Sequence, residues 1–139
     1  MLREVGNGFL LAIGLNNHGE FCMDLCRLDE AAACFREVLQ MPREVSGYVF
    51  GYALHNLGWV QLESGRPDNA IASLTEAHAT HLDSGDLKAQ AIALKYLGQA
   101  QRAIGKEEEA RETWTAALVI FRDLKADAEV EAINTALAA

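Results

Sequence analysis

The pattern of apolar and polar positions along the chain contains one segment that occurs twice. Its landmarks are two leucines, a glycine directly after the second leucine, another glycine, and a row of small and large apolar residues. They are Leu54, Leu57, Gly58, Gly65, Ala70, Leu74 and Ala77 in one copy, and Leu94, Leu97, Gly98, Gly105, Ala110, Trp114 and Ala117 in the other. Each landmark recurs 40 positions later. A fixed period of this size is typical of stacked repeats.

Each copy predicts two antiparallel helices. The two leucines share one helix face, and Gly58 lacks a side chain, so a second helix can approach closely at that point. Gly65 suits the end of the first helix, and Pro67 suits the first turn of the next. The apolar row that follows has the spacing of one stripe on a second helix. We therefore expect each copy to form a helical hairpin.

A third and degenerate copy precedes these two. Gly19 lies 39 positions before Gly58, and the same offset relates Ala31, Phe35 and Val38 to the apolar row of the next copy. Cys26 stands at the position of the turn glycine, and His18 at that of Leu57. Terminal repeats commonly depart from the pattern in this way.

Helix starts give the expected boundaries. Asn7, Ser46 and Asp86 follow the same offsets, and all three are good N-cap residues. We expect one domain over 1–139, with repeats at about 7–45, 46–85 and 86–125. A further helix over about 126–138 carries Val130, Ile133 and Leu137 on one face, and we expect it to cap the stack.

This pattern resembles the tetratricopeptide repeat, whose signature is Leu-Gly in the first helix, a later glycine, and small, large and small apolar positions in the second helix. The period exceeds the standard 34 residues, so the chain is similar to a variety with longer helices. The resemblance implies an all-α, right-handed superhelix of three hairpins plus the cap. The C-terminal part is also similar to the last repeats of large bacterial transcriptional regulators, through Trp114, Ala117, Leu118, Ile120, Phe121, Leu124 and Ala128.

The resemblance further implies a non-catalytic module that binds a protein or peptide in the concave groove lined by the first helices. Three positions per repeat would face that groove. They are Asn16, Glu20 and Met23, then His55, Trp59 and Leu62, then Lys95, Gln99 and Arg102. This row is acidic, then aromatic, then basic. Glu20 would oppose the terminal carboxylate that some family members clamp. The alternative is that Trp59 fills space between repeats and that the charges form a solvated face.

Composition and charge narrow the partners. Half of the residues are hydrophobic but only 7% are aromatic, and both prolines fit helix boundaries, which favours an all-α fold. The net charge of −8 disfavours nucleic acid and anionic membranes, because phosphate binding needs clustered Lys and Arg. No apolar run approaches the ~20 residues that span a bilayer. Three cysteines form no disulfide framework, so we expect a reducing, cytoplasmic compartment.

Two clusters carry candidate chemistry. His18, Cys22 and Cys26 are spaced by four, so on one helix they would share a face, and such side chains are possible zinc ligands. Small buried residues at ordinary repeat positions explain them as well. His78 and His81 could pair on the second helix of the middle copy, although packing is the commoner role. We find no catalytic motif and expect no cofactor.

Self-association is the other functional hypothesis. Phe9, Leu10 and Ile13 lie on the opening helix, with too little chain before Asn7 to cover them. A solenoid without a polar N-terminal cap leaves such faces uncovered. The first repeat could therefore form a homodimer interface or contact an upstream domain.

Overall fold

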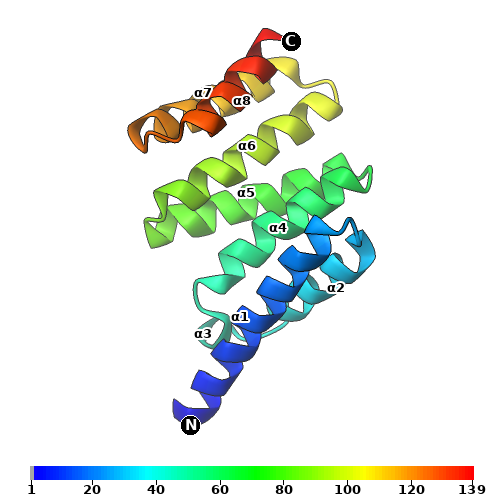
Figure 1. Cartoon of the computed structure of the whole chain (residues 1–139), viewed down its shortest axis with the longest axis vertical. Coiled ribbons are helices and arrows are strands. Elements are labelled where there is room, and N and C mark those ends of the chain that lie inside the picture. Colours follow the sequence, from blue (N-terminus) through cyan, green and yellow to red (C-terminus); the bar gives the residue numbers. More distant parts are fainter. Residues whose placement is uncertain (1) are drawn as a thin grey trace.

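The computed structural model describes residues 2–139, and their side chains from Glu4 onward. Over this range the chain forms helices and no strands (Figure 1). The helices are α1 (Leu2–Asp24), α2 (Leu28–Leu39), α3 (Arg43–Ser46), α4 (Val49–Glu63), α5 (Pro67–Ser84), α6 (Leu87–Ala103), α7 (Glu107–Asp123) and α8 (Asp127–Ala138).

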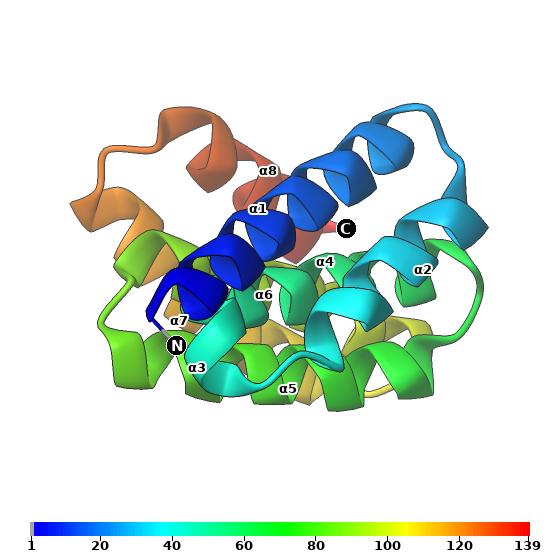
Figure 2. The ribbon, with the colours of Figure 1, turned by 90° about the horizontal axis from the view of Figure 1, so that it is seen from below.

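Three helical hairpins form the stack, namely α1 with α2, α4 with α5, and α6 with α7. They follow one another along the long axis, and α8 closes the far end (Figure 1). Figure 2 looks from below, where α1 crosses the near end of the stack and α2 and α3 lie close to it. The predicted all-α solenoid with a C-terminal capping helix is confirmed.

In each hairpin the two helices touch at an equivalent glycine of the first helix. A β-carbon on Gly58 would lie 2.5 Å from Cγ of Leu74, and one on Gly19 would lie 2.5 Å from Cε1 of Phe35. A β-carbon on Gly98 would collide with the indole of Trp114. These distances are far inside van der Waals contact, so glycine is what allows each first helix to touch the large residue of its partner. The degenerate first copy therefore packs like the other two.

The turns inside the hairpins also repeat. The residue at the turn has a left-handed backbone, with φ of +57° at Cys26, +76° at Gly65 and +84° at Gly105. After each of them the next amide donates to a carbonyl five residues back, as from Arg27 to Cys22 at 2.8 Å. This bond is one part of a Schellman cap. Cys26 thus takes over the role of the turn glycine.

Only one of the three expected helix starts is confirmed. The Asp86 carboxylate accepts the amide of Ala89 at 3.1 Å and caps α6. The expected start at Asn7 is wrong, because α1 already begins at Leu2. That at Ser46 is also wrong, since Ser46 ends α3 with its hydroxyl donated to the Pro42 carbonyl at 3.4 Å. Gly47 then turns the chain with a φ of +56°, and α4 begins at Val49.

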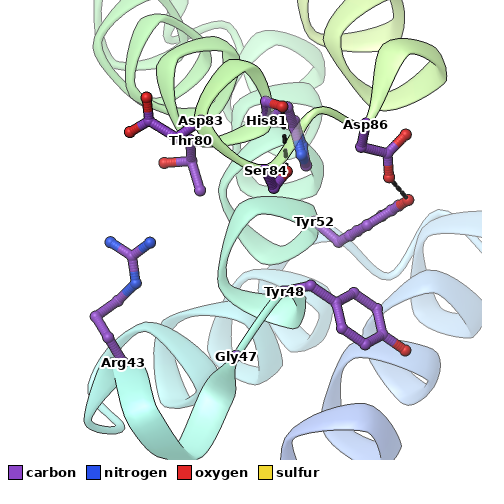
Figure 3. Close-up of a pocket in the computed structure, with 9 residues that line it drawn as sticks. All are labelled: Arg43, Gly47, Tyr48, Tyr52, Thr80, His81, Asp83, Ser84 and Asp86. Carbon is purple, nitrogen blue, oxygen red and sulfur yellow. Dashed lines mark hydrogen bonds between the residues drawn. The ribbon is translucent and has the colours of Figure 1, made fainter.

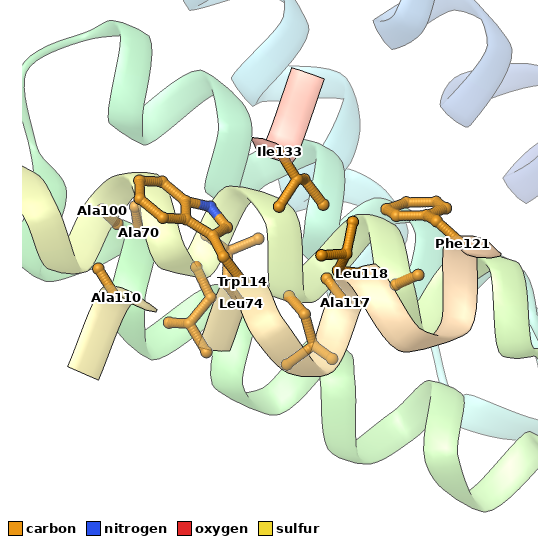
Figure 4. Packing of buried hydrophobic residues seen from close by; sticks show 12 residues of the cluster. Ala70, Leu74, Ala100, Ala110, Trp114, Ala117, Leu118, Phe121 and Ile133 are labelled. Carbon is orange, nitrogen blue, oxygen red and sulfur yellow. The ribbon is translucent and has the colours of Figure 1, made fainter. Parts of the chain in front are cut away.

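Two large apolar clusters form the core. One joins α5 to α8 around Leu74, Trp114, Phe121 and Ile133 (Figure 4). The other joins the first hairpin to α4 around Phe35 and Val38. Ile133 is buried, and Val130 and Leu137 pack beside it, so α8 does cover the end of the stack. None of the described helices combines the length and the apolar character that crossing a membrane requires.

Candidate functional site

The predicted binding residues lie on α1, α4 and α6, and we call the side of these helices that bears them the first-helix face. Its members differ in exposure. Glu20 is exposed; Met23, Trp59, Leu62, Lys95, Gln99 and Arg102 are partly exposed; Asn16 and His55 are buried. Trp59 packs with one side against the core cluster of the first hairpin. The binding roles of these residues remain predictions.

A pocket of about 200 Å³ opens between α1 and α4. We call it the α1–α4 pocket; it is lined by Ile13, Asn16, Asn17, Glu20, Tyr48, Val49 and Tyr52. Oε1 of Glu20 accepts hydrogen bonds from Nδ2 of Asn16 at 3.3 Å and Nδ2 of Asn56 at 3.1 Å. Nδ2 of Asn56 also approaches Oδ1 of Asn16 at 3.2 Å. Two buried amides therefore hold an exposed carboxylate in place.

Aromatic rings continue from this pocket along α4. The ring centroids of Tyr48 and Tyr52 are 5.9 Å apart, and Phe9 lies 5.7 Å from Tyr48. The Tyr52 hydroxyl donates to the carboxylate of Asp86. Burial and this contact with Asp86 raise the pKa of Tyr52 to about 12. Burial opposes ionisation of Asp86, but the hydrogen bonds from Tyr52 and the Ala89 amide keep the pKa of its carboxyl below the usual value.

His55 is buried beneath the first-helix face and is not exposed on it. Its Nδ1 lies 2.9 Å from Nε2 of His81 on α5, and the two residues are only 4% and 2% exposed. In a neutral pair, one ring donates its N–H and the other accepts through its unprotonated nitrogen. Burial, and then the neighbouring His81, lower the pKa of His55 to about 3. His81 thus pairs with His55 rather than with His78.

A second pocket, of about 420 Å³, lies on the other side of the tyrosines. Its lining comprises Arg43, Gly47, Tyr48, Tyr52, Thr80, His81, Asp83, Ser84 and Asp86. Figure 3 shows Arg43 extending from α3 on the side where Thr80 and Asp83 lie, with Tyr52 directed toward Asp86. Tyr48 and Tyr52 line both pockets and therefore stand between them.

The two basic residues of the predicted row, Lys95 and Arg102, already form ion pairs within the chain. Nζ of Lys95 lies 2.8 Å from Glu129 on α8. Arg102 pairs with Glu107, donates to the carbonyl of Ala136 at 2.8 Å, and lies 4.4 Å from the Trp114 ring centre. Close by, burial and then the charges of Glu129, Glu20 and Glu63 raise the pKa of Tyr96. The charge left for a partner on this face is therefore negative.

The metal hypothesis loses its geometric premise. Nε2 of His18 and Sγ of Cys22 are 3.8 Å apart, but Cys26 lies beyond the end of α1 in a left-handed turn. The three side chains therefore do not share one helix face. In the part of the chain that the structure describes, no three His, Cys, Asp or Glu side chains are grouped to hold a metal ion. Burial raises the pKa of the Cys34 thiol, which makes it less reactive.

Of the residues at this pocket, the sequence interpretation assigned only Asn16 and Glu20 to binding, and it missed Tyr48, Tyr52 and Asn56 among the others. Tyr52 carried a signal, because Ile13, Tyr52 and Ile92 each lie six positions before the Leu-Gly glycine of their repeat. This fourth position shares a helix face with the three that the resemblance supplied. Tyr48 has no such signal, because it belongs to the irregular entry into α4.

Comparisons with known proteins agree with this fold. The family model described as tetratricopeptide repeat matches residues 10–83. Among solved structures, the first such repeat region of Spaghetti (RPAP3), bound to the HSP90 peptide SRMEEVD, superposes with a TM-score of 0.67 at 21% identity, covering 92% of this chain and 94% of that chain. No curated protein matches significantly in sequence. Because the family model spans more than half of the chain, the chain belongs to the tetratricopeptide repeat family.

Proposed function

We propose that this chain is a non-catalytic module that binds a protein through a peptide segment laid on the first-helix face. The observation that carries the proposal is the α1–α4 pocket, where fixed polar groups and exposed rings meet on the face that the family uses. Trp59 and Leu62 are partly exposed on the same face and offer apolar contacts. The Spaghetti structure, which is similar in fold, contains a bound peptide.

Display of a random peptide library against the whole chain tests this proposal. Selected peptides should bind wild type and lose about 2 kcal/mol or more of binding free energy on Trp59→Ala, because central aromatic residues dominate such interfaces. Val119→Ala on α7, which removes an exposed side chain from the outer helices, is the matched control. A library that yields no binding peptide, or peptides equally sensitive to Val119→Ala, would contradict the proposal.

We place the module in the cytoplasm, as part of the repeat region of a bacterial regulator. Free thiols at Cys22, Cys26 and Cys34 support a reducing compartment. The similarity of the segment from Trp114 to Ala128 to such regulators supports the second statement. Sequencing the gene neighbourhood and the full reading frame tests it, since a regulator would encode DNA-binding and nucleotide-binding parts before the repeats.

Self-association is a second candidate, favoured by one observation. Phe9 and Ile13 pack partly against the core, but Leu10 of the predicted set and other apolar residues near it are exposed. On α1, Leu10, Leu11 and Phe21 are 67%, 55% and 58% exposed, and Leu25, directly after the helix, is 47% exposed. Sedimentation equilibrium should then show a dimer that Phe21→Glu dissociates and Val119→Glu does not. A monomer at high concentration would remove this candidate.

A further inference from the structure

The α1–α4 pocket contains a carboxylate, that of Glu20, which forms no ion pair with any side chain from residue 4 onward. Both buried amides donate to Oε1 of Glu20, which orients the carboxylate but leaves its charge in place. Among residues 4–139, no Lys, Arg or His lies within ion-pair distance of Glu20. A fixed, charged acceptor at a pocket mouth favours a ligand that brings positive charge and N–H donors.

The other walls suit the stem and head of a long cationic side chain. Tyr48 and Tyr52 present two rings in an edge-to-face arrangement with an interplanar angle of 84°. An ammonium or guanidinium group gains energy over such rings. Ile13 and Val49 supply apolar surface, against which the methylene groups of lysine or arginine pack.

The size of the pocket points to one side chain. Its volume of about 200 Å³ is below the roughly 300–1,000 Å³ of sites that hold whole small molecules. A single residue of a longer ligand fits that volume better than a cofactor does. The remainder of the ligand would then extend over the first-helix face toward Trp59.

The surrounding charge selects against acidic partners. Lys95 and Arg102 are engaged by α8 and the start of α7, so they do not offset Glu20. The chain as a whole carries a net charge of −8. Electrostatic complementarity therefore steers a basic segment to this face. An unpaired Arg102 would instead attract an acidic group of the partner. Because Arg102 is engaged by Glu107 and Ala136, we expect a basic partner.

We propose that the α1–α4 pocket binds an arginine or lysine side chain of a basic partner peptide, with Glu20 as the charged acceptor and Tyr48 and Tyr52 as the aromatic walls. The inference rests on the proposed function and adds the chemistry of the partner. It assigns Asn16 and Asn56 as positioning residues, because they hold the carboxylate from within the protein.

An NMR titration of the whole chain tests the pocket with a defined probe. Nα-acetyl-arginine methylamide is compared with the citrulline analogue, in which a neutral urea replaces the guanidinium. We expect arginine to shift the side-chain amide signals of Asn16 and Asn56 saturably, and citrulline to leave them unchanged. Glu20→Gln should weaken arginine binding by about fivefold or more, the scale of one charge-assisted hydrogen bond. Glu112→Gln, the same change on exposed α7, should have no effect.

Tyr48→Leu provides a second test that does not involve the amide network. Tyr48 is 61% exposed, so its loss leaves the core intact. We expect arginine binding to weaken by about twofold to threefold, as for a cation losing one exposed ring. Equal shifts with citrulline, wild-type affinity in Glu20→Gln, or shifts confined to the signals of Thr80 and Ser84, which line the second pocket, would overturn the proposal.

The peptide library separates this inference from the proposed function. Selected peptides should contain an arginine or lysine whose replacement by citrulline or norleucine weakens binding in wild type but not in Glu20→Gln. Peptides that bind without a basic residue would overturn the inference and leave the proposed function standing. If no peptide is selected, the proposed function fails, and the arginine titration still decides what the pocket binds.

Discussion

A single glycine in each first helix determines how closely the two helices of a hairpin pack. Gly19, Gly58 and Gly98 face Phe35, Leu74 and Trp114, so a large buried residue of each second helix lies over a glycine of the first. Gly14 looks similar in the sequence, since it also lies inside a helix. Nothing lies within 4 Å of the β-carbon that Gly14 would carry. Adding a side chain should therefore change stability in opposite directions at the two kinds of glycine.

Alanine at these two positions should separate them. Gly98→Ala forces the Trp114 indole to move, and overpacking of this kind costs about 1–3 kcal/mol. Gly14→Ala meets no neighbour and should stabilise the chain by about 0.5–1 kcal/mol, because glycine is a poor helix former. Urea unfolding followed by circular dichroism measures both changes. Equal effects of the two substitutions would show that Gly98 is not a point of helix contact.

The buried histidine pair makes stability depend on pH. Burial lowers the pKa of His55 to about 3, and it also lowers that of His81 despite the opposing charge of Asp86, whereas the ordinary value is 6.5. The unfolded chain therefore binds more protons between these values, so the stabilisation is complete above pH 6.5 and is lost as the pH falls. We expect the free energy of unfolding to be about 1–3 kcal/mol lower at about pH 4.5 than at about pH 7.

Two variants test whether the buried histidine pair causes that pH dependence. His81→Phe places at this site the residue found at the equivalent position of the next repeat, the fully buried Phe121, and should flatten the dependence. His18→Gln, at an exposed position, should leave it unchanged. A wild-type protein whose stability does not change between these pH values would show that the pair is not held neutral.

Single residues could be predicted from the sequence where the geometry of the repeat requires a particular contact or backbone conformation. The glycine facing Phe35 and the left-handed turn at Cys26 follow from repeat position alone. The site was harder to predict, because the repeat fixes which face a residue occupies but not which neighbours it meets. His55 shares its repeat position with Lys95, yet His55 is buried against His81 whereas Lys95 is partly exposed.

At the scale of elements, the repeat pattern did not predict the short helix α3 or the early start of α1. The short helix α3 begins directly after Pro42, its N-cap residue, and ends where the Ser46 hydroxyl donates to the Pro42 carbonyl and Gly47 turns the chain. The long α1 begins before Asn7 because the segment from Leu2 contains no proline, and Gly6 lowers the helix propensity without breaking the helix. By contrast, α8 was predicted from three apolar residues, and these residues hold it against the stack.

The capping helix is also held by polar contacts. Arg102 donates to the carbonyl of Ala136, and Arg111 to that of Leu137 at 2.7 Å, so two cations bind the C-terminal end of α8. This placement is favourable because the carbonyl end of a helix carries partial negative charge. Arg102→Gln should therefore loosen α8, and we expect its amides to exchange severalfold faster in hydrogen exchange mass spectrometry.

Arg122→Gln is the matched control for that change. Arg122 is exposed on α7, and its replacement removes the same charge as Arg102→Gln does. Amide exchange in α8 should therefore stay at the wild-type rate. Peptide binding provides a further distinction, since an arginine that is already engaged adds little to the affinity for a partner. A variant with unchanged exchange in α8 but weaker peptide binding would show that Arg102 serves the partner and not the cap.

At the scale of the molecule, stability is divided along the stack. One core cluster spans the first hairpin and α4, and the other spans α5 to α8. They are joined by a small cluster in which Leu54, Ala77 and Ala93 are buried. In a solenoid each unit contacts only its neighbours, so a local loss of packing weakens adjacent units most. The two halves should therefore respond separately to damage in either cluster.

Phe35 and Phe121 allow this division to be tested with one substitution at two places. Both side chains are fully buried, one in each cluster, and Phe→Leu removes ring contacts at a cost of about 1 kcal/mol. Native-state hydrogen exchange should show that Phe35→Leu speeds opening of α1, α2 and α4, and that Phe121→Leu speeds opening of α6, α7 and α8. If both variants instead accelerate exchange uniformly along the chain, the stack unfolds as one cooperative unit. The α1–α4 pocket lies entirely in the first half, so in the expected case Phe35→Leu should also weaken arginine binding, while Phe121→Leu leaves it intact.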